Sequence, residues 1–99
     1  MKIVAVTACP TGIAHTYMAA EQLEKTARRL GHQIKVETQG AMGIENELSA
    51  EDISGAELVI FAADITVQKP ERFANLKIIE VEVQEAIKNP AALFNPVSQ

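Results

Sequence analysis

The chain has 99 residues, 47% of them hydrophobic, and this length suits one domain with a single core. Its nine Lys and Arg residues and thirteen Asp and Glu residues give a net charge of −4, which argues against binding to the phosphate backbone of DNA or RNA. The longest apolar run, residues 58–63, is too short to cross a bilayer, and a single cysteine excludes an internal disulfide.

Four β-prone segments are predicted, over residues 3–6, 33–38, 58–63 and 77–82. The first and third are continuous apolar runs, which are typical of strands covered on both faces in the middle of a parallel sheet. The second alternates apolar and polar residues, and the fourth mixes apolar residues with charges. This is more typical of edge strands.

Helices are predicted between these strands. Apolar residues recur at three-and-four spacing from Ile13 to Leu30, and Gly31 follows as a stop signal. Ser49 to Asp52 has the spacing of a capping box, which predicts a short helix closed by Gly55. Further short helical segments are expected at 70–73, 83–88 and 90–94.

This alternation of strands and helices predicts an α/β fold with right-handed crossovers. With the first and third strands central, the sheet is four-stranded and parallel in the order 2-1-3-4, doubly wound as a three-layer α/β/α sandwich. We expect the domain to span residues 1–94, with 95–99 as a tail or linker. Ligands of such sheets bind beyond the carboxyl ends of the strands, where the winding reverses. Cys9 and Asp64, which follow the two central strands, should therefore lie at this switch point.

Residues 9–16 lead from the end of a strand into the start of a helix. Gly12 allows close approach of the backbone, and the first N–H groups of a helix have no internal partner, so an anion-binding loop is predicted here. The positive helix end also favours the thiolate of Cys9, the nucleophilic form. A lone cysteine is more often core filling than a nucleophile. The strand-to-helix position, Gly12 and the hydroxyls of Thr11 and Thr16 together favour a site.

Three chemistries compete for this loop. Thiol redox chemistry is disfavoured, because Gly12 stands where a resolving cysteine would be. A low-molecular-weight phosphatase or arsenate reductase would need Arg after five intervening residues, in the motif Cys-x5-Arg, where this chain has His15. A flavodoxin-like FMN binder is a further alternative, although the chain has no Trp and a single Tyr to stack on a flavin. A loop that accepts and holds a phosphoryl group fits best.

The sequence from Val6 to Ala20 closely resembles the phosphorylation loop and first helix of the fructose-specific enzyme IIB component of the bacterial phosphoenolpyruvate-dependent sugar phosphotransferase system. The stretches Val36 to Gly40 and Phe61 to Asp64 agree with the same family, and the resemblance covers roughly residues 2–94. Tyr17 stands where the family usually has Phe.

The resemblance implies a phosphotransferase in which Cys9 accepts a phosphoryl group from a phosphohistidine of enzyme IIA. Cys9 then passes the group to fructose, or a fructose-like sugar, bound by the membrane enzyme IIC. It implies no cofactor and no metal. The expected phosphate-binding residues are Thr11, Gly12, Ile13, Ala14, His15 and Thr16. We add the hypothesis that His15, in place of Arg, limits loss of the phosphoryl group to water.

The expected location is the cytoplasm, at the inner face of the membrane, without insertion into it. The first residues superficially resemble a lipoprotein signal, but only six residues separate Lys2 from Cys9, fewer than the roughly 7 to 15 of an apolar signal region.

Several other residues have simpler interpretations. Asp64 is expected to cap the loop that follows it, and His32 to be exposed to solvent. The segment from Gly40 to Gly43 is either a rim of the site or an ordinary turn. Four basic residues are interpreted as solvated charges: Arg28, Arg29, Lys69 and Arg72.

Overall fold

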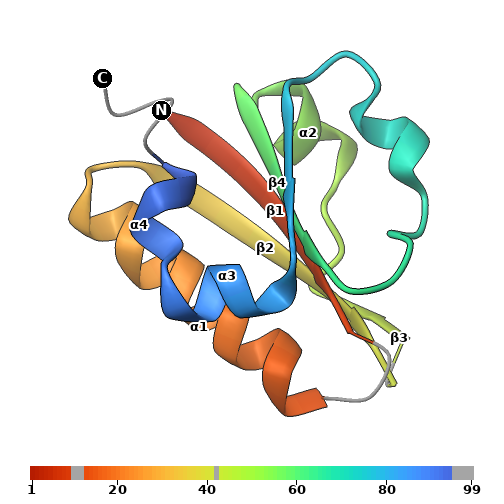
Figure 1. Ribbon diagram of the computed structural model, residues 1–99. Helices are drawn as coiled ribbons and strands as arrows, with labels where there is room; N and C mark the ends of the chain where they lie inside the picture. The colour runs from red at the N-terminus through yellow and green to blue at the C-terminus, as the bar shows by residue number, and fades with distance from the viewer. Residues whose placement is uncertain (10–12, 42, 95–99) are drawn as a thin grey trace.

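A computed structural model describes residues 1–9, 13–41 and 43–94, and Figure 1 shows the fold. Five strands form one sheet in the order β3-β2-β1-β4-β5. The strands are β1 (Lys2–Ala8), β2 (Gln33–Gly40), β3 (Gly43–Glu45), β4 (Leu58–Ala63) and β5 (Ile78–Val81). All neighbouring pairs are parallel except β2 and β3, which are antiparallel.

Helical segments cover both faces of this sheet. They are α1 (Ile13–Arg29), α2 (Ala50–Ser54), the 3₁₀ helix η1 (Pro70–Phe73), α3 (Val83–Lys88) and α4 (Pro90–Leu93). Helices α1, α3 and α4 lie together on one face, as Figure 1 shows, while α2 and η1 pack against the other. The predicted three-layer α/β/α sandwich is therefore confirmed.

The two central strands owe their position to apolar runs. Alternate residues of β1 face opposite layers: Ile3 and Ala5 pack towards α1, while Val4 and Val6 pack towards α2 and η1. Continuous hydrophobicity is what a strand needs when both of its faces are buried. The parallel strands also follow the predicted order.

The strand β3 was missed by the sequence prediction, which gave four strands and placed residues 33–38 at an edge. Its three residues pair antiparallel with the end of β2, where Gly40 lies opposite Gly43. A segment this short shows no periodicity that could identify it. At Thr38 and Gln39 the second strand therefore has a neighbouring strand on each side. Its residues 36–39 are buried.

The predicted helix boundaries rest on capping interactions that the structure contains. Ser49 Oγ accepts a hydrogen bond from the Asp52 N–H at 3.1 Å, and the Ser49 N–H donates to Asp52 Oδ2 at 2.9 Å. This is the predicted capping box of α2. After α1, Gly31 adopts φ +84°, a conformation that glycine enters without steric strain.

The expectation that His32 is exposed was wrong. It is half-buried, with its ring stacked on Phe94 at a centroid distance of 6.1 Å. Among the described residues, neither of its ring nitrogens has a hydrogen-bond partner. Phe94, just after α4, is fully buried in the cluster beneath α1 and α3, and its ring covers that of His32. Residues 95–99 lie outside the described part of the chain, so their interpretation as a tail stays a prediction.

Candidate functional site

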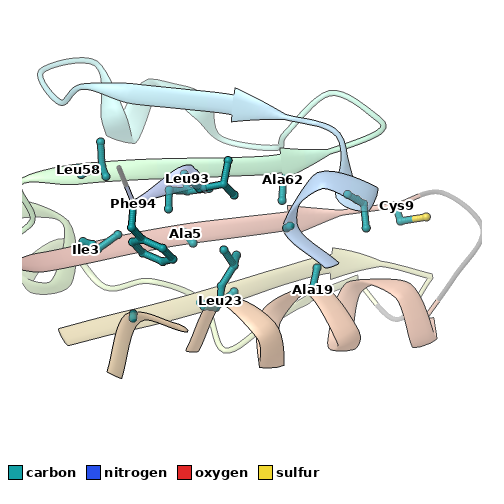
Figure 2. Packing of buried hydrophobic residues seen from close by; sticks show 14 residues of the cluster. Ile3, Ala5, Cys9, Ala19, Leu23, Leu58, Ala62, Leu93 and Phe94 are labelled. Carbon is teal, nitrogen blue, oxygen red and sulfur yellow. The ribbon is translucent and has the colours of Figure 1, made fainter. Parts of the chain in front are cut away.

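Cys9 directly follows β1 at the carboxyl edge of the sheet. Its N–H donates to the Gln39 carbonyl at 3.3 Å, which continues the pairing of β1 with β2. The residue is 3% exposed and belongs to the apolar cluster beneath α1. In Figure 2 it lies at the end of this cluster, with its sulfur directed away from the other side chains. The thiol therefore stands where the winding of the sheet reverses, as the topology predicted.

The start of α1 and the end of β2 meet beside Cys9. The Cys9 carbonyl oxygen and the Thr16 side chain both lie 3.8 Å from the position that a Cβ on Gly40 would take. Thr16 is buried, and its carbonyl accepts a hydrogen bond from Thr7 Oγ1 at 3.1 Å. The first turn of α1 is therefore held against the carboxyl ends of β1 and β2.

The predicted phosphate-binding residues divide into two groups. Ile13, Ala14, His15 and Thr16 form the first turn of α1, in which Ala14 and His15 are exposed to solvent. Thr11 and Gly12 lie outside the described residues, so their predicted contacts remain predictions. The helix N-terminus directed to this edge supplies N–H groups and a partial positive charge, which suit an anion.

Asp64 lies beside Cys9 at the end of β4, and its polar groups are committed to the fold. Its N–H donates to the Ala8 carbonyl at 2.9 Å. Its carboxylate Oδ1 accepts the Val83 N–H at 3.1 Å, at the start of α3. Asp64 was expected to cap the loop that follows it, but in the described residues its carboxylate instead accepts the N–H at the start of α3, 19 residues away.

A buried ion pair beneath the carboxyl edge was missed by the sequence analysis. Glu37 on β2 has no exposed surface, and its two carboxylate oxygens accept bidentate hydrogen bonds from Arg72 at 2.9 and 3.0 Å. The Leu48 N–H also donates to this carboxylate, at 3.0 Å, and Gln39 Nε2 donates at 2.6 Å. Arg72 is therefore a structural partner, and its interpretation as a solvated charge was wrong.

The electrostatics of the pair are reciprocal. Burial raises the pKa of the Glu37 carboxyl, but hydrogen bonds from Arg72, the Leu48 N–H and Gln39 outweigh it and hold that pKa below its usual value. The hydrogen bonds that Arg72 donates to Glu37 in turn raise the pKa of Arg72. Both groups therefore stay charged at neutral pH.

Lys69, also interpreted as a solvated charge, forms an exposed ion pair with Glu47 at 2.8 Å.

Gly40 ends β2 next to Cys9 and Thr16, and Gly43 begins β3, so whether the residues between them form a rim of the site stays a prediction. Tyr17 on α1 ties β3 to the helix, because its phenol donates a hydrogen bond to Glu45 of β3. That hydrogen bond to a carboxylate raises the pKa of Tyr17. Met42 lies outside the described residues.

Other kinds of site find less support in the described ranges. Their residues contain no group of three or more His, Cys, Asp and Glu side chains that could hold a metal ion. No helix in those ranges is long and apolar enough to cross a membrane. One pocket lies between α2 and η1, away from the predicted site residues, and is lined by Leu48, Ala50, Ile53, Ser54, Arg72, Asn75 and Leu76.

Comparisons with known proteins agree with this geometry. The family model described as "PTS system, Lactose/Cellobiose specific IIB subunit" matches residues 4–96. The "PTS system fructose-like EIIB component 2" of Escherichia coli strain K12 is 51% identical over 96 residues, covering 97% of this chain and 91% of the relative. A "Fructose-like PTS system EIIBC component" from the same strain is 50% identical over 97 residues, which are 96% of this chain and 20% of the relative.

A solved structure extends the agreement to the fold. The solution structure of an enzyme IIB subunit of the PTS system from Escherichia coli K12 superposes with a TM-score of 0.91 at 44% identity. The match covers 97% of this chain and 89% of that one. Sequence and fold agree, and the chain belongs to the IIB family of the sugar phosphotransferase system.

Proposed function

We propose that this chain is a phosphoryl carrier in which Cys9 accepts a phosphoryl group from a phosphohistidine of an enzyme IIA partner. The group then passes to fructose, or a fructose-like sugar, held by a membrane enzyme IIC. The observation that carries the proposal is the place of Cys9, which follows a central strand directly and lies beside the first turn of α1 in a chain of the IIB family.

Both transfer steps balance with Cys9 as the acceptor and then the donor. In the first, the thiolate sulfur attacks phosphorus, the S–P bond forms, and the P–N bond breaks with its electron pair left on the imidazole nitrogen. In the second, a sugar hydroxyl oxygen attacks the same phosphorus. The S–P bond breaks, its electron pair returns to sulfur, and the hydroxyl proton is released. N–H groups at the start of α1 would stabilise the charge on the phosphoryl oxygens, so positioning and electrostatics carry the reaction.

The surroundings of Cys9 suit a carrier better than a hydrolase. Phosphatases of the cysteine type clamp the phosphate with a planar, bidentate guanidinium, and here the corresponding residue is His15. His15 is exposed in the first turn of α1. Without the clamp, phosphocysteine persists long enough to meet a second partner. His15→Arg should therefore release inorganic phosphate faster than wild type, and an unchanged release rate would contradict this role for His15.

The partners follow from the family and from one relative. The fructose-like relative named EIIBC matches this chain over 20% of its own length, which supports an enzyme IIC partner for this chain. We place the carrier in the cytoplasm at the inner face of the membrane, where a IIC component can be reached. Cys9 is 3% exposed as a residue, so either partner has to approach it at the carboxyl edge of the sheet.

The test is phosphorylation by a phosphorylated enzyme IIA protein, followed by intact-mass measurement. Wild type should gain the mass of one phosphoryl group, and Cys9→Ser and Cys9→Ala should gain none. Phosphate retained by both variants would contradict the assignment of Cys9. Rapid hydrolysis of an aryl phosphate by wild type would instead favour the phosphatase alternative.

A further inference from the structure

Gln39 contacts Cys9 through its main chain and a second segment through its side chain. Its carbonyl accepts the Cys9 N–H at 3.3 Å. Its side-chain Oε1 accepts the Gln68 N–H at 2.8 Å, and its Nε2 donates to the Gln68 carbonyl at 3.3 Å and to Glu37 at 2.6 Å. The residue is 1% exposed. The buried side chain of Gln39 therefore connects β2, whose Gln39 carbonyl accepts the Cys9 N–H, with the segment that follows β4.

The other end of this network fixes two further segments. Glu37 binds Arg72 of η1 and the Leu48 N–H just before α2. Arg72 also donates to the Gln68 carbonyl at 3.2 Å and, through Nε, to the Lys69 carbonyl at 2.8 Å. The segments that follow β3 and β4 are thereby held to β2, in a layer on the opposite side of the sheet from α1.

Stability alone is a weak explanation for this arrangement. Removing an amide, a carboxylate and a guanidinium from water is costly, and apolar side chains of similar volume often give equal or greater stability. A fully hydrogen-bonded buried network, in contrast, selects one relative placement of the segments that it joins. The segments joined here converge on the residue that pairs with Cys9.

We propose that Gln39 is a positioning residue for phosphoryl transfer at Cys9, an inference that rests on the proposed function. Its side chain fixes the end of β2 against the segment after β4, and its carbonyl holds the Cys9 N–H in the resulting place. In-line attack on phosphorus is sensitive to position, and a displacement of about 1 Å can slow such a reaction on the order of 100-fold. Loss of the side-chain amide should therefore slow the transfer itself rather than weaken donor binding.

The test variant is Gln39→Met, which keeps the length of the side chain and the main-chain carbonyl but removes every side-chain hydrogen bond. Single-turnover phosphorylation of Cys9 is measured over a range of phosphorylated IIA concentrations. The maximal rate should fall roughly 10- to 100-fold, while the half-saturating donor concentration stays within about twofold of the wild-type value.

The matched control is Val59→Ala, a fully buried change near the start of β4, at the opposite end of the sheet from Cys9. It lowers stability without touching the network, and both variants are assayed at a temperature at which each is fully folded. Should Gln39→Met not fold, Gln39→Asn serves in its place, because it keeps the amide but shortens its reach to Gln68. The expected fall in maximal rate is then smaller but present.

The outcomes separate the two proposals. Normal phosphorylation of wild type with a Gln39 variant whose maximal rate matches the Val59→Ala control overturns the positioning role alone. Failure of wild type to accept phosphate at Cys9 overturns the proposed function and the positioning role together.

Discussion

The buried ion pair between Glu37 and Arg72 makes a quantitative prediction for the variant Arg72→Met. The Glu37 side chain has no exposed surface, and that of Arg72 is 16% exposed. Methionine fills most of the same volume but donates no hydrogen bond. Glu37 then keeps the Leu48 N–H and Gln39 as donors while losing both bonds to the guanidinium.

The expected cost at pH 7 is about 3 to 5 kcal/mol of unfolding free energy. Breaking one partner of a buried pair costs roughly this much, because the remaining charge is left without compensation. Two hydrogen bonds to a charged group, at roughly 1.5 to 3 kcal/mol each, give a similar figure. For a domain of this length, each kcal/mol shifts Tm by about 4 to 8 °C. The control Arg28→Met removes an exposed pair with Glu24 at 3.7 Å and should cost under about 0.5 kcal/mol.

The pH dependence has a defined sign. In wild type the folded pKa of Glu37 lies below its unfolded value, so the stabilisation is present at neutral pH and is lost as the pH falls through the folded pKa. In Arg72→Met, the hydrogen bonds from Arg72 no longer lower the pKa of Glu37, while burial still raises it. The Glu37 carboxyl of the folded variant therefore takes up a proton at a higher pH than in wild type. The difference in stability between the two proteins should therefore narrow as the pH falls from the folded pKa of Glu37 in the variant to its lower folded pKa in wild type.

The assay is urea unfolding followed by far-UV circular dichroism at several pH values. The double variant Glu37→Met and Arg72→Met should recover most of the stability lost in Arg72→Met, because no charge is left buried. A cost below about 1 kcal/mol at pH 7, or a difference that widens on acidification, would refute this account of the pair.

Three further predictions concern stability and titration. Leu23→Ala, in the fully buried face of α1, should cost about 2 to 5 kcal/mol in the same urea experiment, and a cost under about 1 kcal/mol would mean that the site collapses to fill the cavity. Ser49→Ala removes the capping box of α2 and should cost about 1 kcal/mol without changing the rate of phosphorylation of Cys9, so a slower rate would contradict this separation. Glu45→Gln should lower the midpoint of the alkaline titration of Tyr17, because the carboxylate that raises its pKa is removed. Ultraviolet absorbance reports this titration directly, since the chain has one tyrosine. An unchanged midpoint would count against the hydrogen bond between Tyr17 and Glu45.

Much of the fold could be predicted because its strongest signals are local. Residues 3–6 and 58–63 are apolar throughout, which fits only strands covered on both faces, and chirality of the crossovers then limits the order of the strands. The same topology located Cys9 and Asp64 at one edge of the sheet. The sequence also indicated the capping box at Ser49, because capping depends on residues three apart.

The missed features depend on residues far apart in the chain. Glu37 and Gln39 occupy the polar phase of an alternating strand, and such a phase normally faces solvent. It is buried here because α2 and η1 cover that face, and because Arg72, 35 residues away, supplies the opposite charge. No pattern in the sequence near Glu37 indicates that it pairs with Arg72. The strand β3 was missed for a related reason, since three residues acquire their structure from the neighbouring strand.

Both layers of the fold determine where Cys9 lies. On the α1 side, Cys9 closes the end of an apolar cluster, so its side chain is fixed by packing. On the other side, Gln39 and its buried partners fix the strand whose carbonyl accepts the Cys9 N–H. Apolar packing is non-directional and tolerates small shifts, whereas hydrogen bonds to a buried carboxylate and amide require defined positions. If Cys9 carries the phosphoryl group as we propose, the polar layer, rather than the larger apolar core, therefore sets the precision of the transfer.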